Sequence, residues 1–419
     1  MQHVASSSQK SKNSAAGLFA KRIARGLGRR MRDFGSMEPE GFELDNIPRA
    51  DIALYFADQP AKLYQLTQWL PVFEQRSDLT TIVVARNIES YLALQKITSL
   101  QVLLVPRYED LMALYDRASF HAVIYVNNAW TNFQSLSFQQ AVHIHVNHGE
   151  SDKICMVSNQ AKAYDKVFVA GQAAIDRHRA AIAWFDLSHL VPVGRPQLDL
   201  DIKNPLPHTA LQTITYAPTW EGEDEANNYT SVDLYGVDIA TAALAVPGAR
   251  FVYKPHPRVI DSADPNVRAR HKEIVELIKN AGGEHRYLPR GDILGVLPET
   301  DLLIADVSSV TLDHLYLSPA APIIVTDRRS NRDLLHSDSP MTSACQVIDM
   351  NSVSKISSLI AAELEEDTHR DQRDAMRTYY FGDVTQGAST EKFWRELTSS
   401  IHDHDVTLQG LQRTRTIGE

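Results

Sequence analysis

The sequence predicts an α/β protein with two Rossmann-like domains that face each other across a cleft, preceded by a basic amphipathic segment. Short apolar runs alternate with helix-like segments, as in parallel sheets built from βαβ units. The alternation breaks once, in the Pro-rich and polar stretch 198–212, and then restarts. At 419 residues, with 43% hydrophobic and 22% charged residues, the chain has the size and composition of a two-domain soluble globular protein.

The basic segment covers residues 1–45. Residues 1–32 contain eight Lys and Arg residues and no Asp or Glu, so the rest of a chain with net charge −10 carries −18. Within residues 17–34 apolar side chains recur every three to four positions, which places them on one face of a helix, opposite the basic side chains. A basic amphipathic helix on an acidic body is typical of a segment that lies on anionic lipid.

We therefore expect residues 10–34 to bind an anionic membrane surface, and the protein to be cytoplasmic and peripheral on the inner face of the cell membrane. A disordered basic tail, a nucleic-acid arm and an Arg-rich presequence are alternatives. The acidic body argues against nucleic acid as a partner. Cys155 and Cys345 are too few for a disulfide scaffold or a thiolate zinc site, and no run of 18 apolar residues is present.

The first Rossmann-like domain is expected over residues 46–205. Helices are expected at segments such as 61–75 and 108–118, where apolar residues recur with helical spacing. Its strands are expected at seven apolar runs: 51–57, 80–86, 101–106, 121–128, 143–149, 165–171 and 189–194.

The second Rossmann-like domain is expected over residues 206–395, after the linker. Four runs predict its strands: 213–220, 249–257, 300–309 and 321–327. A helix is expected around 389–401, and residues 396–419 are interpreted as a polar tail. Because ligands bind at the carboxyl ends of the strands in open parallel sheets, the polar residues that follow the strands are candidate site residues.

Three strand ends in the second domain carry such residues. Ser308 and Ser309 open a helix, where two hydroxyls, free N–H groups and the positive end of the helix dipole suit a phosphate. The alternative is that one serine is only an N-cap. Lys254 and His256 lie between prolines that stiffen their loop, and they suit an anionic ligand. Thr219 ends another strand in the same way.

The stretch 141–153 contains three histidines. His143 and His145 share one face of the expected strand, while His148 lies at its end, on a loop opened by Gly149. An H-x-H pair can bind zinc, but the stretch lacks a matching acidic ligand, and His148 points away from the other two. We therefore expect no metal, a functional role for His148 and structural roles for His143 and His145.

Five short motifs follow one another at strand ends. They are His148-Gly149 with Lys153, "GRPQLD" (194–199), "YAPTW" (216–220), "KPHP" (254–257) and "DVSSVTLD" (306–313). In this order they resemble the motifs of the CDP-glycerol glycerophosphotransferase family, the teichoic acid primases and polymerases, which have a GT-B-type fold. The resemblance covers roughly residues 50–390.

The resemblance implies a transferase that moves a phosphopolyol, glycerol phosphate first of all, from a CDP-activated donor to an acceptor hydroxyl in cell-wall or capsule polymer synthesis. The hydroxyl attacks the β-phosphorus and CMP leaves. The implied partners are CDP-glycerol or a related CDP-polyol in the second domain and a lipid-linked or polymer acceptor in the first. No metal and no cofactor are implied.

The site residues follow from the same resemblance. His148 is implied as the general base, since imidazole titrates near neutrality, and His256 as a second catalytic residue. The implied donor- and phosphate-binding residues are Lys254, Ser308, Ser309, Asp313, Thr219 and Arg195, with Glu150, Lys153 and Asp199 as alternatives.

The chain departs from the family motifs at four positions. Glu150 stands where the motif has Thr, Gln197 and Glu221 stand where it has Arg, and Val307 stands where it has Tyr. These departures leave the identity of the transferred polyol open.

Two other functions remain possible from the sequence: a nucleotide-sugar glycosyltransferase or epimerase of the same architecture, and a non-catalytic nucleotide-binding protein at the membrane surface. The "HDHD" at 402–405 is interpreted as part of a solvated tail rather than as a metal cluster.

Overall fold

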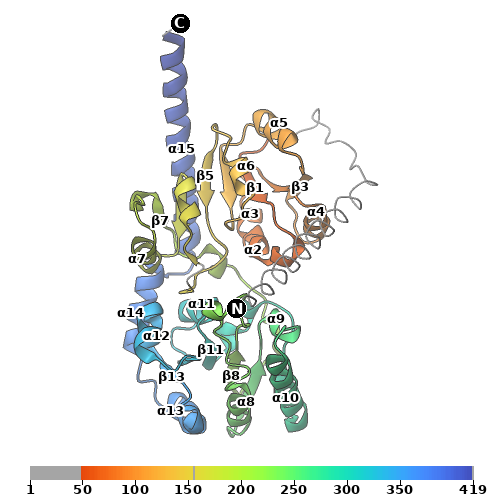
Figure 1. Ribbon diagram of the computed structural model, residues 1–419, viewed down its shortest axis with the longest axis vertical. Helices are drawn as coiled ribbons and strands as arrows, with labels where there is room; N and C mark the ends of the chain where they lie inside the picture. Colours follow the sequence, from red (N-terminus) through yellow and green to blue (C-terminus); the bar gives the residue numbers. More distant parts are fainter. Residues whose placement is uncertain (1–48, 154–155, 418–419) are drawn as a thin grey trace, which may run out of the picture. The chain divides into compact units, whose positions relative to one another are not determined.

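The computed structural model describes residues 49–153 and 156–417, which lie within one compact unit, Pro48–Glu419. Two parallel sheets form its framework (Figure 1). The first has seven strands in the order β3-β2-β1-β4-β5-β6-β7. Its strands are β1 Ile52–Phe56, β2 Thr81–Ala85, β3 Gln101–Leu104, β4 Ala122–Tyr125, β5 Val142–His145, β6 Lys166–Val169 and β7 Leu190–Pro192.

The second sheet has six strands in the order β10-β9-β8-β11-β12-β13. They are β8 Gln212–Ala217, β9 Ala249–Tyr253, β10 Arg286–Tyr287, β11 Leu302–Asp306, β12 Ile323–Thr326 and β13 Gln346–Ile348. In both sheets the strand order reverses once, beside β1 and beside β8, and such reversals open a crevice at the carboxyl ends of the strands. The prediction of two parallel α/β sheets is therefore confirmed.

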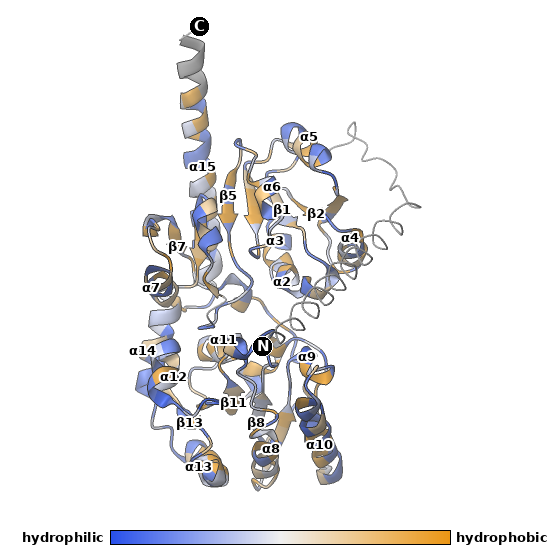
Figure 2. Ribbon diagram, viewed as in Figure 1, coloured by the Kyte–Doolittle hydropathy of each residue, from blue (hydrophilic) through white to orange (hydrophobic). Residues whose placement is uncertain are grey.

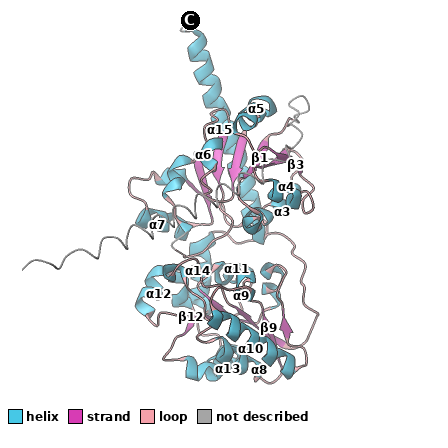
Figure 3. Cartoon of the chain, turned by 45° about the vertical axis from the view of Figure 1, so that its right-hand side comes forward, coloured by secondary structure: helices cyan, strands magenta, loops and turns pink. Residues whose placement is uncertain are grey.

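Helices flank the strands of each sheet (Figure 3). In the first half they are α2 Tyr64–Thr67, α3 Leu70–Glu74, α4 Ile88–Leu94, α5 Tyr108–Ala118, α6 Asn132–Ser135 and α7 Gln172–Ala181. The second half contains α8 Gly236–Leu244, α9 Pro257–Ile260, α10 Pro265–Ala281, α11 Ser309–Leu317, α12 Arg332–Asp338 and α13 Ile356–Glu365, followed by α14 Arg370–Phe381 and α15 Ala388–Ile417.

Local sequence signals explain where helix α10 begins and ends. The Asp264 side chain accepts the Asn266 N–H at the N-cap, and Pro265 occupies the first turn, where it has no intrahelical donor to lose. Gly282 ends the helix with φ 65°, a conformation that glycine adopts without steric cost. Between these ends hydrophobic and hydrophilic residues are mixed, whereas strands such as β1 are mainly hydrophobic (Figure 2).

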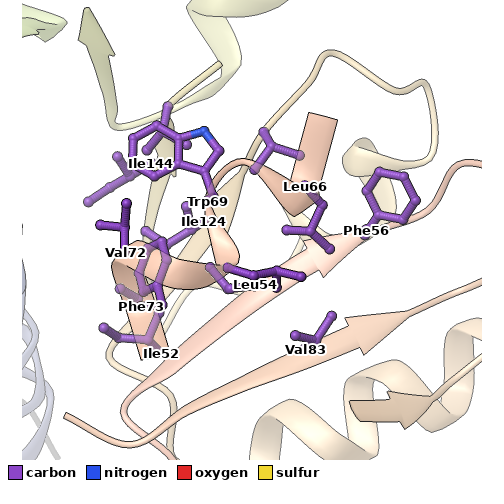
Figure 4. Packing of buried hydrophobic residues seen from close by; sticks show 14 of the residues in the cluster. Ile52, Leu54, Phe56, Leu66, Trp69, Val72, Phe73, Val83, Ile124 and Ile144 are labelled. Atoms are coloured by element: carbon purple, nitrogen blue, oxygen red, sulfur yellow. The ribbon is translucent and has the colours of Figure 1, made fainter. Parts of the chain in front are cut away.

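The core of the first half gathers around Trp69 and Phe73, with apolar residues from β1, β2, β4 and β5 (Figure 4). Helix α15, which follows the second sheet in the chain, completes this core. Phe393 lies 5.2 Å from Trp69 between ring centroids, and Trp394 lies 5.3 Å from Phe73. Leu397 is fully buried in the same cluster. The helix expected around 389–401 is therefore present and packs against the first half.

Residues 396–417 continue helix α15, so the described part of the polar tail expected at 396–419 is helical. Strands β10 and β13 were not expected, because runs of two and three residues give no periodic signal.

The basic segment 1–45, including the membrane-binding residues expected at 10–34, lies outside the described residues. Of the helices that the structure describes, none has the length and apolar character needed to cross a membrane.

Candidate active site

His148 follows strand β5 at a tight turn. The ladder ends where the Val146 N–H donates to the Tyr125 carbonyl at 2.8 Å, and Asn147 then takes a left-handed backbone conformation with φ 54°. Asparagine tolerates this conformation because its short side chain bonds locally. Here Asn147 Oδ1 accepts the His148 N–H at 2.8 Å, and Trp69 Nε1 donates to the Asn147 carbonyl at 2.6 Å. The turn therefore fixes the direction in which His148 leaves the sheet.

The His148 imidazole is enclosed, but one of its nitrogens has no partner. Tyr64 contacts the ring edge-on, with centroids 5.8 Å apart, and Nδ1 is buried without a hydrogen bond to any described residue. Burial lowers the pKa of His148 to about 4, although a hydrogen bond to the Val126 backbone opposes the decrease and the charge of Arg195 adds to it. The ring is therefore neutral near pH 7. Because the Val126 carbonyl can only accept, the proton faces Val126 and Nδ1 keeps its lone pair.

The N-terminus of helix α11 lies beside this turn. A Cβ added to Gly149 would lie 4.0 Å from the Cβ of Ser309. Ser308 is the N-cap residue, but its side chain caps no backbone N–H, and its Oγ is buried without a partner among the described residues. The first N–H groups of a helix have no intrahelical acceptor, so this terminus offers several donors to an anion. The structure thus places the turn that contains His148 and Gly149 beside Ser309, at the start of α11.

A second group of basic side chains surrounds His256, which follows β9. Its Nδ1 accepts the Arg258 N–H at 3.2 Å, so in the neutral ring the proton lies on Nε2. The ring stacks on Trp220 with centroids 6.2 Å apart. Burial lowers the pKa of His256 to about 4, and the nearby charges of Lys153, Arg258 and Lys254 lower it further. Burial also lowers the pKa of Lys254, an effect that the carboxylate of Asp292 opposes.

Thr219 connects the basic side chains around His256 with the end of strand β11. Its backbone N–H donates to the buried Asp306 carboxylate at 2.7 Å, and its Oγ1 accepts from Lys153 Nζ at 3.2 Å. Lys153 Nζ also lies 5.6 Å from the centroid of the Tyr229 ring. Lys153 comes from the loop after His148, so the two groups of candidate residues meet through it. The sequence predicted His148, Lys153 and Thr219 separately, and the structure supplies the contact between Lys153 and Thr219.

Arg195 and Asp313 form a buried ion pair. The Nη1 atom of Arg195 donates to Asp313 Oδ1 at 2.9 Å, and about 5% of each residue is exposed. Burial raises the pKa of Asp313 to about 6, although Arg195 opposes this increase. The ion pair links the segment after β7 to helix α11. Sequence analysis could not place Arg195 and Asp313 together, because they are 118 residues apart in the chain.

Asp199 holds the start of the long C-terminal helix. Its Oδ1 accepts from Tyr316 Oη at 2.9 Å, and its Oδ2 accepts both the N–H and the Oγ1 hydroxyl of Thr390 at 2.8 Å. Gly194 lies so close to Ser389 that a Cβ there would come within 2.1 Å of Oγ. These contacts give Asp199 a structural task, in addition to the role expected from its motif.

Glu150 and Asp152 share Arg177, which sequence analysis missed. Both guanidinium Nη atoms of Arg177 lie 2.7 Å from Glu150 Oε1, and Nη2 lies 3.4 Å from Asp152 Oδ1. Asp152 Oδ2 also accepts from Ser339 Oγ at 2.7 Å and from Tyr380 Oη at 2.6 Å. Burial raises the pKa of Asp152 despite these donors. No local pattern marks Arg177, because its partners come from another loop.

His143 and His145 differ although they share one face of β5. His143 Nδ1 lies 2.8 Å from Tyr125 Oη and its Nε2 lies 2.6 Å from the Phe138 carbonyl oxygen, so both ring nitrogens have partners. His145 stacks on Tyr164 with centroids 5.0 Å apart, and its Nε2 is buried with no partner among the described residues. Across residues 49–153 and 156–417, no three His, Cys, Asp or Glu side chains are grouped to hold a metal ion.

Two pockets open near these groups. The first, of about 590 Å³, lies at the carboxyl ends of β5, β6 and β7 and is lined by polar residues that include Asn128, His145, Glu150, Arg177, Arg195 and Gln197. The second, of about 400 Å³, lies at the ends of β11 and β12 and is lined by Tyr229, Val307, Thr326, Asp327, Arg329 and Asn331.

The departures from the expected motifs have visible consequences. Glu221 accepts hydrogen bonds from the Ser262 hydroxyl and the Ala263 N–H, and so stabilises the loop before α10. The positive charge of the arginine in the family motif is absent at this position. Val307 lines the second pocket with an apolar surface. Gln197 Oε1 accepts from Arg195 Nε at 3.4 Å and lines the first pocket as a neutral group.

Several solved structures share this fold. A putative UDP-N-acetylglucosamine 2-epimerase from Listeria monocytogenes matches with a TM-score of 0.55 and 14% identity, over 81% of this chain and 94% of its own. The wall teichoic acid polymerase TagF matches with 0.53 and 14%, over 86% and 91%. The S. aureus MnaA–UDP co-structure matches with 0.51 and 14%, over 81% and 94%. At these identities the likeness shows the fold alone, and it confirms the expected GT-B-type architecture.

No curated protein matches the sequence significantly. Residues 114–333 match the sequence profile of the family CDP-glycerol:poly(glycerophosphate) glycerophosphotransferase. This range is just over half of the 419 residues, and it contains His148, Lys254, His256, Ser308 and Ser309. The chain therefore belongs to the CDP-glycerol:poly(glycerophosphate) glycerophosphotransferase family.

Proposed function

We propose that this protein transfers glycerol phosphate from CDP-glycerol to an acceptor hydroxyl and releases CMP. One observation carries the proposal: the His148-Gly149 turn lies beside the N-terminus of α11, where the Ser308 hydroxyl has no partner among the described residues. A neutral imidazole next to the N–H and hydroxyl donors of a helix N-terminus suits phosphoryl transfer to a hydroxyl.

The donor phosphates bind at the ends of β9 and β11. Ser308 Oγ and the first N–H groups of α11 donate to one phosphate, and Lys254 supplies positive charge. His256 donates from Nε2, because its Nδ1 is already bonded to the Arg258 N–H. The cytosine binds at the second pocket, which is lined by Tyr229 and Val307 and adjoins Ser308.

The acceptor hydroxyl approaches from the side of His148. Its proton passes to the unpartnered Nδ1 as its oxygen bonds to the β-phosphorus, and the bond between that phosphorus and the bridging oxygen of CMP breaks. The bound diphosphate raises the pKa of His148 from its low value, because a nearby negative charge favours the protonated ring. Lys254, His256 and the α11 terminus stabilise the charge that develops on CMP.

A nucleotide panel tests this function. Purified protein is incubated with CDP-glycerol, UDP-N-acetylglucosamine or GDP-mannose and a hydroxyl acceptor, and the released nucleotide is identified. We expect CMP from CDP-glycerol alone. Release of UDP would assign the protein to the nucleotide-sugar enzymes, and nucleotide binding without any product would assign it a non-catalytic role.

We further propose that the product is a teichoic acid or a related polymer, made on a lipid-linked or polymeric acceptor at the inner membrane face. The basic, amphipathic pattern of residues 10–34 supports membrane contact. Deleting residues 1–35 should release the protein from anionic vesicles, since each Lys or Arg near such a surface contributes about 1 kcal/mol. Deleting residues 1–9, which contain no Lys or Arg, is the matched control. Equal co-sedimentation of both deletions would place the anchor elsewhere.

A further inference from the structure

The loop of residues 149–153, which follows His148, is held by side chains and not by regular structure. It contains no helix or strand. Two of its acidic residues are nevertheless buried, with Glu150 4% exposed and Asp152 8% exposed. Because a buried carboxylate needs hydrogen-bond donors, the groups that bond to these two residues fix the course of the loop.

The hydroxyl donors to Asp152 come from the second half of the chain. Asp152 Oδ2 accepts from Ser339 Oγ at 2.7 Å and from Tyr380 Oη at 2.6 Å, across 187 and 228 residues of sequence. Tyr380 lies in α14 and is fully buried. Its hydroxyl accepts the Met341 N–H at 3.2 Å, so its single proton is donated to Asp152. Arg177 lies 3.4 Å from the other carboxylate oxygen, so both halves of the chain anchor the loop.

Lys153, the residue after Asp152, brings a positive charge to the basic side chains around His256. Its Nζ donates to Thr219 Oγ1 at 3.2 Å. Burial lowers the pKa of His256, and the charge of Lys153 is the next largest cause of the decrease. A lysine side chain is long and flexible, and neighbouring cations repel it. A fixed backbone at the base of this side chain therefore keeps the ammonium group at the strand ends.

We propose that Tyr380 is a positioning residue of the donor site: together with Ser339 it holds Asp152, and thereby the loop, so that Lys153 meets the donor diphosphate. The inference deepens the proposed function and rests on it. The Tyr380 hydroxyl is occupied by Met341 and Asp152 inside the fold. Its effect on the donor must therefore pass through the loop that carries Lys153.

A double-mutant cycle on the full chain tests this coupling, with CDP as the probe and isothermal titration as the measurement. Lys153→Gln should weaken CDP binding about tenfold, the size of one hydrogen bond to a charged group. Tyr380→Phe removes only a hydroxyl and should weaken CDP binding about fivefold. In the Lys153→Gln background the same change should cost less than about twofold, because the group that Tyr380 positions is already absent.

Tyr379→Phe is the matched control. Tyr379 is the neighbouring residue on α14, and its hydroxyl donates at 3.0 Å to Asp176, a partly exposed carboxylate outside the loop. This variant should leave CDP affinity unchanged with or without Lys153. Cytidine, which has no phosphate, is the second probe, and saturation-transfer NMR should give it the same affinity in the wild type and in Tyr380→Phe.

Ser339→Ala removes the other hydroxyl donor to Asp152 and leaves the aromatic core of α14 intact. It should also weaken CDP binding, so it tests the same loop even where Tyr380→Phe lowers the melting temperature. Unchanged CDP affinity in both variants would overturn the proposal. Equal losses with and without Lys153 would overturn it too, as would an equal loss of cytidine binding or a wild type that does not bind CDP.

The proposed transferase function has a separate measurement, the release of CMP from CDP-glycerol. If the two changes are coupled but no CMP is released, the transferase function fails and the positioning role of Tyr380 stands. If CMP is released but the losses of Lys153→Gln and Tyr380→Phe simply add, the positioning role fails and the transferase function stands.

Discussion

The carboxyl ends of the two sheets carry positive charge in opposite ways. At the first sheet Arg177 and Arg195 are buried against carboxylates that neutralise them. At the second sheet the basic groups crowd one another, and the charges of Lys153, Arg258 and Lys254 lower the pKa of His256 beyond the effect of burial. Buried ion pairs hold a structure together, whereas several neighbouring positive charges at a strand end favour the binding of an anion. Under the proposed function, this difference favours the second sheet as the place where the donor diphosphate binds.

The sharpest test of this division is His148, at the end of the first sheet. His148→Ala should lower kcat by about 10²–10⁴-fold, the usual contribution of a general base, with CDP-glycerol affinity nearly intact. His143→Ala should cost far less turnover, because His143 is bonded only within the fold. Steady-state kinetics with CMP detection measures both variants. Full turnover in His148→Ala would make Glu150 or Asp152 the candidate base.

The paired charges predict a stability effect of similar size. Arg195→Ala leaves the Asp313 carboxyl buried without its partner and should lower the free energy of unfolding by about 3–5 kcal/mol. Arg179→Ala removes an exposed arginine from its pair with Asp176 and should cost about 0–1 kcal/mol. Urea denaturation of the two variants gives the comparison. Equal losses would mean that burial does not distinguish the two pairs.

The crowded charges predict a weaker effect on binding. Ser308→Ala combined with Ser309→Ala removes the hydroxyls at the α11 terminus and should weaken CDP binding by about 1–3 kcal/mol, as measured by isothermal titration. Ser318→Ala, at the other end of the same helix, serves as the control. Unchanged CDP affinity in the double variant would move the phosphate site away from α11.

The smallest effect per step of the experiment is a change in the pH dependence of stability, about 1.4 kcal/mol for each pH unit. Burial lowers the pKa of His145 to about 3, below its value in the unfolded chain, so between pH 6.5 and 3 the unfolded state binds the extra proton. The stability due to a neutral His145 is therefore present above pH 6.5 and is lost as the pH falls. His145→Phe should reduce the slope of the unfolding free energy against pH by about 1.4 kcal/mol per pH unit, as measured by denaturation curves from pH 7 to 4. An unchanged slope would show that water reaches the ring.

The repeated strands and the strand-end motifs could be predicted from sequence because their signals are local. All seven strands of the first sheet were predicted, and both serines of α11 were located as helix openers. The buried ion pairs could not be predicted from the sequence. Arg195 contacts Asp313, and Arg177 contacts Glu150 and Asp152, only after the chain has folded. The alternation of side chains along a strand placed His143 and His145 on one face. It could not predict that the ring nitrogens of His143 are hydrogen-bonded, with Phe138 as one partner, whereas His145 stacks on Tyr164.

Helix α15 has a consequence for the way this protein is made. Trp69 and Phe73 are synthesised more than 300 residues before Phe393 and Trp394, which pack against them. The core of the first sheet therefore closes only after helix α15 has been synthesised, whereas every strand of the second sheet precedes α15 in the chain. A chain cut shortly before residue 388 would keep every strand of both sheets and still expose the aromatic surface that α15 covers.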